Sequence, residues 1–142
     1  MLVSDAMSTD LVTCSVNASL REAVERMLSE GVGSSVVYED EAPIGIVTET
    51  DALHSVCSKR KLLSEISVNE VMSSPVVKVS KDKTLRHAAR KMRKNEIKKL
   101  VVVDDMEFVG IVTTQDIIYN YHQLKSEIHD VTRSWKRNGR TI

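Results

Sequence analysis

The chain has 142 residues, 42% of them hydrophobic and 28% charged, which is ordinary for a globular protein long enough to bury a core. No apolar run approaches 18 residues, and the first residues carry neither a basic segment nor a long apolar one, so the sequence indicates no membrane span and no secretory signal. We therefore expect a cytoplasmic protein. Cys14 and Cys57 are too few for a disulfide framework, and we expect both to be small apolar fillers.

The formal net charge is zero, but the charges are unevenly spread along the chain. Residues 1–67 have a balance of −6, and residues 68–142 have a balance of +6. Opposite poles favour antiparallel pairing of two chains, although salt screens such attraction beyond about 10 Å. A homodimer is therefore expected.

In chain order, the first elements are a helical turn at residues 4–8 and a strand at 11–14. A polar corner then leads to a helix for which Ser19 is the predicted N-cap. The apolar residues of this helix have the spacing of one buried face, and they are Leu20, Ala23, Val24, Met27 and Leu28. Gly31 is predicted to end the helix. A hairpin of strands 34–38 and 43–48 follows, and then a second helix.

The same order returns 65 residues later. A shift of that length aligns residues 5–53 with 70–118 without a gap and gives 16 identities in 49 positions. The second copy has a turn at 69–73, strands at 76–79, 99–103 and 108–113, and a helix from Thr84 to about Asn95. We predict two β-α-β-β-α units, each with a mixed three-stranded sheet. Apolar runs such as LVVV at 100–103 indicate sheets covered on both faces.

Two segments lie outside the repeated elements. Residues 58–67 join the copies, and three apolar side chains in it are expected to dock on the protein: Leu62, Leu63 and Ile66. The last helix continues beyond the repeat with a heptad-like apolar seam formed by Ile117, Tyr121, Leu124, Ile128, Val131 and Trp135. Such a seam must be buried, either on the same chain or against a partner helix in a dimer.

The most similar stretches of the copies are GIVTETD at 45–51 and GIVTTQD at 110–116. The glycine leaves room for something to approach the backbone. Thr48 and Thr113 stand where a strand meets a helix, and a hydroxyl beside the free N–H groups of a helix start can hold a phosphate. Asp51 and Asp116 offer two acceptor oxygens each, suited to the hydroxyls of a ribose. The same pattern is also a capping box, and both roles can coexist.

On these residues the repeat resembles the cystathionine β-synthase (CBS) domain, over about residues 3–120. The resemblance implies an α+β fold of the α/β type, in which two tandem β-α-β-β-α CBS repeats form one pseudo-twofold unit, a Bateman module, with an extended C-terminal helix. The expected boundaries are 3–60 for the first domain, 68–125 for the second, and 126–142 for the helix extension and a basic tail.

The resemblance also implies two ligand clefts, each combining the motif of one copy with a strand of the other. One would contain Thr48 and Asp51 with Val76, Val77, Lys78, Lys98 and Lys99. The other would contain Thr113 and Asp116 with Leu11, Val12 and Thr13. Gly33 and Ser34 replace the two lysines in this second cleft, so we expect it to hold phosphate less well. Lys98 and Lys99 could equally belong to a solvated basic face.

The function implied is regulation without catalysis: binding of AMP, ADP, ATP or S-adenosylmethionine signals to an unknown protein effector. No cofactor is required, and no metal site and no catalytic residue are expected. One alternative is nucleic-acid binding by a basic tail around Trp135, with Arg133, Lys136, Arg137 and Arg140. Another is a purely structural dimer with empty clefts.

Overall fold

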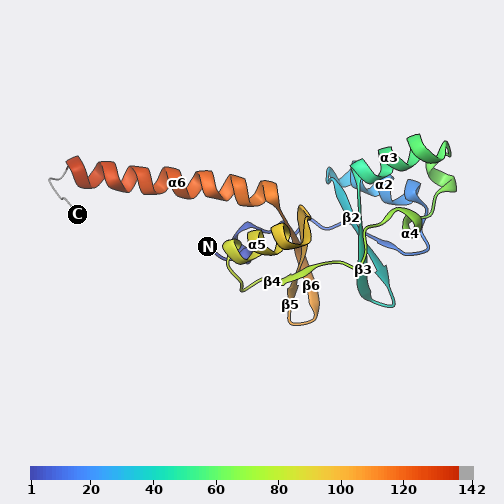
Figure 1. Ribbon diagram of the computed structural model, residues 1–142, viewed down its shortest axis with the longest axis horizontal. Coiled ribbons are helices and arrows are strands. Elements are labelled where there is room, and N and C mark those ends of the chain that lie inside the picture. Colours follow the sequence, from blue (N-terminus) through green and yellow to red (C-terminus); the bar gives the residue numbers. More distant parts are fainter. Residues whose placement is uncertain (138–142) are drawn as a thin grey trace.

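The computed structural model describes residues 1–137, apart from the side chains of Leu124, Trp135 and Lys136 (Figure 1). The first unit contains β1 (Thr13–Ser15), α2 (Leu20–Glu30), β2 (Ser34–Glu39), β3 (Ala42–Thr48) and α3 (Glu49–Lys59). The second contains β4 (Lys78–Ser80), α5 (Leu85–Asn95), β5 (Lys99–Asp104), β6 (Glu107–Thr113) and α6 (Thr114–Arg137). Three short helical segments lie outside these elements: α1 (Val3–Ala6) precedes the first unit, and η1 (Leu63–Glu65) and α4 (Val68–Val71) lie between the two units in the chain.

Each unit has a mixed three-stranded sheet, as the sequence predicts. The order is β1-β2-β3 in the first unit and β4-β5-β6 in the second. In both units the first strand pairs in parallel with the central strand, which pairs antiparallel with the third. The first strands begin at Thr13 and Lys78, two residues later than predicted, although the carbonyls of Val12 and Val77 still accept hydrogen bonds from the central strands at 2.9 and 3.0 Å.

The predicted helix ends are confirmed. The hydroxyls of Ser19 and Thr84 accept hydrogen bonds from the third residue of α2 and α5, at 3.2 and 3.1 Å. Gly31 follows α2 in the left-handed conformation, with φ of 67°. After α5, Glu96 takes the same conformation with φ of 54°, which a side-chain-bearing residue adopts less readily than glycine.

The two sheets are covered on both faces, as their apolar runs predict. Helices cover the outer faces, and the inner faces pack against each other through Val36, Ile46, Val101 and Ile111, all at most 9% exposed. These four residues form two pairs related by the 65-residue shift. The contact between the sheets is therefore pseudo-twofold.

The leading turn of each repeat packs on the other unit. Val3 is fully buried in the core of the second unit, and its N–H donates to the Lys83 carbonyl at 2.8 Å. Val68 is fully buried in the core of the first unit, and its N–H donates to the Ala18 carbonyl at 3.1 Å. Each unit therefore needs the other repeat's turn to complete its core.

The motif glycines make room for these exchanged turns. A Cβ on Gly110 would lie 2.8 Å from the Ser8 carbonyl oxygen, and one on Gly45 would lie 2.6 Å from the Met72 sulfur. Ser8 also exchanges backbone hydrogen bonds with Ile111 of β6. The approach expected at the motif glycine is thus made by the chain itself.

The segment between the units docks only in part. Ile66 is 1% exposed and Leu63 packs beside the first core, as predicted, but Leu62 is 68% exposed, so that part of the prediction is wrong. Leu62 is the N-cap residue of η1, and its side chain stays largely at the surface. The filler prediction is also wrong for Cys57, which is exposed on α3, while Cys14 is partly buried.

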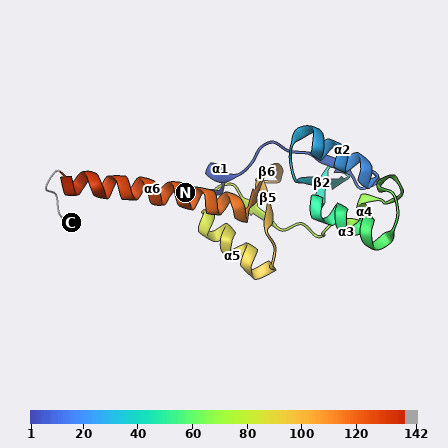
Figure 2. The same cartoon turned by 90° about the horizontal axis from the view of Figure 1, so that it is seen from above.

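The long helix α6 packs on its own unit only near its start. It contacts α1, α5 and β6 there, and then continues away from both units (Figures 1 and 2). Ile117 is partly buried, whereas Tyr121, Ile128 and Val131 are 59%, 58% and 46% exposed. The described seam residues beyond Ile117 are therefore not buried on this chain, and Leu124 and Trp135 lie outside the described side chains.

Candidate functional site

The two Thr–Asp motifs begin α3 and α6, and their local geometry is the same. The Thr48 N–H donates to Asp51 Oδ2 at 2.9 Å, and the Asp51 N–H donates to Thr48 Oγ1 at 3.1 Å. Thr113 and Asp116 form the same pair of bonds at 2.8 and 3.1 Å. Both motifs are capping boxes. Each box uses Oδ2 of its carboxylate and an acceptor site of its hydroxyl, so Oδ1 and the hydroxyl proton stand outside the cap.

Lys99 lies between the two motifs. It is the first residue of β5, is partly buried, and is paired with Thr113 across the ladder. Burial lowers the pKa of Lys99, while the nearby carboxylates of Glu49, Asp51 and Asp116 act in the opposite direction. Glu49 and Asp51 belong to the first unit and Lys99 to the second. The charge of the lysine therefore interacts with carboxylates of both units.

The remaining residues expected in the clefts lie at different depths. Leu11 and Val76 are partly buried and pack against the contact between the sheets. The side chains of Val12 and Val77 instead pack with the helix-covered cores, so these two residues could meet a ligand only through their backbone.

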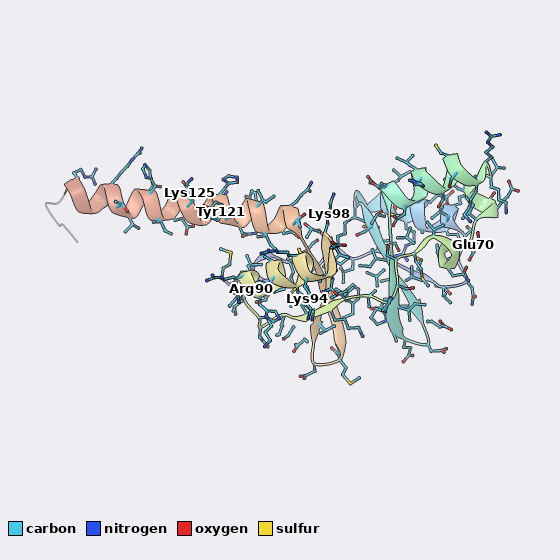
Figure 3. The ribbon with its side chains drawn as sticks, viewed as in Figure 1. Glu70, Arg90, Lys94, Lys98, Tyr121 and Lys125 are labelled. Atoms are coloured by element: carbon cyan, nitrogen blue, oxygen red, sulfur yellow. The ribbon has the colours of Figure 1, made fainter. Side chains whose placement is uncertain are left out.

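The positions at the start of the first strands are tied to the neighbouring helices. The Thr13 carbonyl accepts from the Arg26 side chain, and the Lys78 carbonyl accepts from Lys91. Lys98 is exposed beside the start of α6, and its carbonyl accepts from the Thr114 N–H at 2.9 Å (Figure 3). Of the expected residues, Lys99 carries a charge that interacts with both motif aspartates.

The two motifs differ in the charges around them. Ser34 stands at the place of Lys99, where it pairs with Thr48, and Gly33 stands at the place of Lys98. Glu49 adds a carboxylate beside Lys99, and the corresponding residue of the second motif is Thr114. Sequence reasoning missed Glu49, because it occupies a position where the two motif copies differ.

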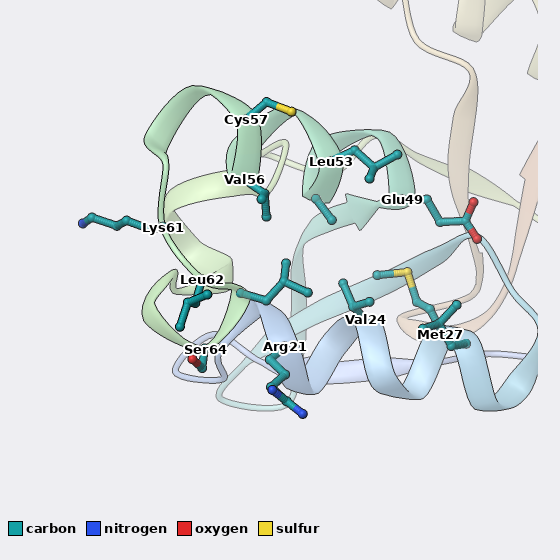
Figure 4. Close-up of a pocket in the computed structure, with 13 residues that line it drawn as sticks. Arg21, Val24, Met27, Glu49, Leu53, Val56, Cys57, Lys61, Leu62 and Ser64 are labelled. Atoms are coloured by element: carbon teal, nitrogen blue, oxygen red, sulfur yellow. The ribbon is translucent and has the colours of Figure 1, made fainter.

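A separate apolar groove of about 690 Å³ lies on the outer face of the first unit (Figure 4). It runs between α2 and α3 and is closed at one end by the segment around η1. Two leucines on its walls, Leu28 and Leu53, are 72% and 71% exposed, and Leu62 is 68% exposed at its end. Glu49 and Cys57 also line it. This groove is outside the expected ligand clefts.

Other candidate sites can be placed within the described residues. Residues 1–137 contain no cluster of three His, Cys, Asp or Glu side chains able to hold a metal ion, and none of their helices has the length and apolarity needed to cross a membrane. Arg133 and Arg137 are exposed on α6. Arg140 lies outside the described residues, as do the side chains of Trp135 and Lys136.

The symmetry seen in the fold agrees with a family comparison. The family model described as "CBS domain" matches the chain twice, at residues 3–58 and 68–123. The chain belongs to the CBS domain family. Its tandem pair includes both Thr–Asp motifs and both sheets, which confirms the expected family and fold.

Curated relatives share about a third of the aligned residues. The Methanopyrus kandleri protein MK0525 is 36% identical over 118 residues, which cover 82% of this chain and 60% of that protein. The CBS domain-containing protein YhcV of Bacillus subtilis is 33% identical over 119 residues, covering 83% of this chain and 84% of YhcV. The chain thus spans most of YhcV, but less than two thirds of MK0525.

Solved structures of CBS domain pairs have the same fold. The pair of protein MJ0100, in complex with 5′-methylthioadenosine and S-adenosyl-L-methionine, has a TM-score of 0.76 and 28% identity, covering 87% of this chain and 97% of that one. The CBS domain protein PAE2072 from Pyrobaculum aerophilum, complexed with AMP, has a TM-score of 0.71 and 27% identity, covering 82% and 89%. Members of the family with this fold therefore bind adenosine-containing ligands.

Proposed function

We propose that this CBS pair is a non-catalytic regulatory module that binds an adenine nucleotide or S-adenosylmethionine between its two repeats. The observation that carries the proposal is the position of Lys99, whose charge interacts with Asp51 across the boundary between the units. A cation is thus within electrostatic range of a carboxylate that has one oxygen outside its cap, and that carboxylate belongs to the same capping box as a threonine hydroxyl. These groups suit a phosphate and a ribose.

The bound ligands of MJ0100 and PAE2072 support the adenosine part of this proposal. Leu11 and Val76, beside the apolar contact between the sheets, are the side chains proposed to meet the base. Backbone groups of residues 11–13 and 76–78 are proposed to hydrogen-bond with it. The clefts at Asp51 and Asp116 are not equivalent, and the one containing Lys99 is proposed to be the stronger phosphate site.

The regulatory output is proposed to pass to a protein effector through a homodimer. A ligand held between the units would favour one relative position of the two repeats, and a partner that distinguishes those positions would respond. The exposed α6 seam supports pairing, since an apolar stripe on a helix is stable when another helix covers it.

Nucleic-acid binding is the second candidate, and α5 favours it. The segment from Lys78 to Lys99 holds ten Lys or Arg residues, and within the described structure only Lys81 pairs with a carboxylate, that of Asp104 at 3.2 Å. A face of unpaired cations suits phosphates. Figure 3 shows Arg90 and Lys94 on this helix and Lys98 just after it.

Thermal unfolding with AMP, ADP, ATP and S-adenosylmethionine tests the main proposal. A ligand at 100 times its Kd should raise the free energy of unfolding by about 2.7 kcal/mol. Absence of any shift at millimolar ligand would leave the clefts without a nucleotide role. Titration with duplex DNA and RNA at two salt concentrations tests the second candidate, because phosphate contacts give a steep loss of affinity with salt.

A further inference from the structure

The groove between α2 and α3 is an apolar surface that this chain leaves open. Leu28 and Leu53 are more than two-thirds exposed along its walls. The corresponding face of the second unit differs, because Arg93 replaces Leu28 and the hollow there is about 330 Å³ rather than 690 Å³. An exposed leucine pair beside a hollow of this size indicates a surface that another element covers.

The chain also carries an apolar element with nothing against it. The part of α6 after Tyr121 is about 24 Å long at about 1.5 Å per residue, whereas α2 and α3, with 11 residues each, are about 16 Å long. This part of α6, here called the arm (residues 122–137), presents Ile128 and Val131 to solvent. The arm is long enough to run the whole length of the groove.

The arm of a chain cannot reach the groove of the same chain. The groove lies at one end of the molecule, and α6 leaves from the other unit and points away from it (Figures 1 and 2). Any filling of the groove by the arm must therefore occur between two copies. Two such contacts form at once if the copies are antiparallel, since a twofold axis repeats each contact.

We propose that two copies pair antiparallel, with the arm of each lying in the α2–α3 groove of the other. This inference rests on the homodimer part of the proposed function and adds which surfaces meet. It differs from a coiled coil of arm against arm, in which the groove would stay open.

Charge complementarity supports a second copy as the occupant. α5, which lies beside the start of α6, carries five Lys or Arg residues and no acid. α2, on the wall of the groove, carries three Glu and two Arg, and α3 adds Glu49 and Asp51 against Lys59. In the antiparallel pair the basic end of one copy faces the acidic end of the other. The −6 and +6 halves of the chain thus come together.

Two single variants and their mixture test this pairing by sedimentation or light scattering. Leu53→Asp places a carboxylate in the groove, and Ile128→Asp places one on the arm. Both side chains are well exposed in the single chain, so both variants should fold. Each homodimer loses two contacts and should dissociate at least about 100-fold more readily, at about tenfold or more per contact. The controls are Met106→Asp, at a 95% exposed hairpin position, and Ser126→Asp, on the opposite side of α6.

The mixture of the two variants is decisive. The intact arm of Leu53→Asp meets the intact groove of Ile128→Asp, so only one contact is lost and a heterodimer should form at least about tenfold more tightly than either variant homodimer. Cys57 lines the groove and gives a second readout. Its alkylation should be slow in the wild-type dimer and fast in Ile128→Asp, while the partly buried Cys14 should react slowly in both.

Each contrary result has a distinct meaning. A wild-type chain that stays monomeric at high concentration would overturn both this inference and the proposed homodimer. A dimer lost in Ile128→Asp but kept in Leu53→Asp would establish arm-to-arm pairing and overturn only the inference, as would a mixture that fails to pair. Assembly that needs added DNA or RNA would overturn it in favour of a nucleic-acid partner. Ligand binding is measured separately by thermal shift, and its result does not depend on any of these four outcomes.

Discussion

The two CBS repeats have the same backbone but different chemistry. Their sheets, capping boxes and contact residues correspond position by position. Their differences lie in charge and exposure: Lys99 against Ser34, Thr114 against Glu49, and Arg93 against Leu28. The residues that form the pseudo-twofold core are thus alike in the two repeats, whereas charge and exposure at these other positions differ.

The largest expected effect concerns the motif glycines. Gly110→Ala should destabilise the protein by about 1–3 kcal/mol, because its methyl group would meet the Ser8 carbonyl, which is fixed by two backbone hydrogen bonds to Ile111. Gly45→Ala should cost less, because its nearest neighbour is the flexible Met72 side chain. Urea denaturation of both variants measures the difference, and equal losses would contradict this account of the exchanged turns.

The next effect concerns the two aspartates. Asp51→Asn should weaken binding of AMP about tenfold, because an amide that keeps its oxygen on the cap presents an NH₂ donor to the ribose in place of the carboxylate acceptor Oδ1. Asp116→Asn should weaken it less, because Lys99 is replaced by Ser34 in that cleft. Isothermal titration of both variants measures the affinities. Both variants keep the oxygen that caps the helix, so each serves as a control for the folding of the other. A larger loss in Asp116→Asn would reverse the proposed order of the clefts.

The smallest expected effect is a pH dependence from Lys99. Burial lowers the pKa of Lys99 in the folded chain, so between this pKa and the ordinary lysine value the unfolded chain binds more protons, and stability without ligand should rise with pH there. A bound phosphate favours the charged lysine and raises its pKa again. Affinity for AMP should therefore be constant below the folded-state pKa and fall severalfold above it.

A Lys99→Arg variant is the matched control, because a guanidinium stays charged throughout this range. Its AMP affinity should not change with pH in this range, whereas Ser34→Ala, which leaves Lys99 in place, should keep the wild-type fall in affinity. Titration calorimetry across the alkaline range gives these affinities. A wild-type affinity that is flat to the ordinary lysine pKa would remove Lys99 from the site.

Much of the fold could be predicted because it depends on local patterns. The helix caps at Ser19 and Thr84, the apolar spacing of α2 and the hairpins all arise from residues a few positions apart. The repeat also made the mixed sheets and their two covered faces predictable, since one unit with two apolar sheet faces needs a twin. The strand starts were predicted two residues early because the first paired residues, Thr13 with Val36 and Lys78 with Val101, are each 23 positions apart and have no local pattern.

The site was predictable in its motifs but less so in its surroundings. Thr48, Asp51, Thr113 and Asp116 could be chosen from sequence because capping and ligand binding share one spacing. The proximity of Glu49 to Lys99 could not, because the two residues are 50 positions apart and come together only when the units pack. The directions of the side chains just before β4 likewise depended on packing. Val76 packs at the contact between the sheets, whereas its neighbour Val77 packs in the core of the second unit.

By itself, the sequence determined the duplication, the order of elements in each copy and the two capped Thr–Asp motifs, because these depend on spacing within one repeat. Only the tertiary structure decided that the leading turns change places, that the charge of Lys99 interacts with the other repeat's aspartate, and that a groove and an arm at opposite ends stay uncovered. The physical reason is that burial and charge interaction act through space. Residues that are distant in the chain bury or interact with one another only once both units have packed together.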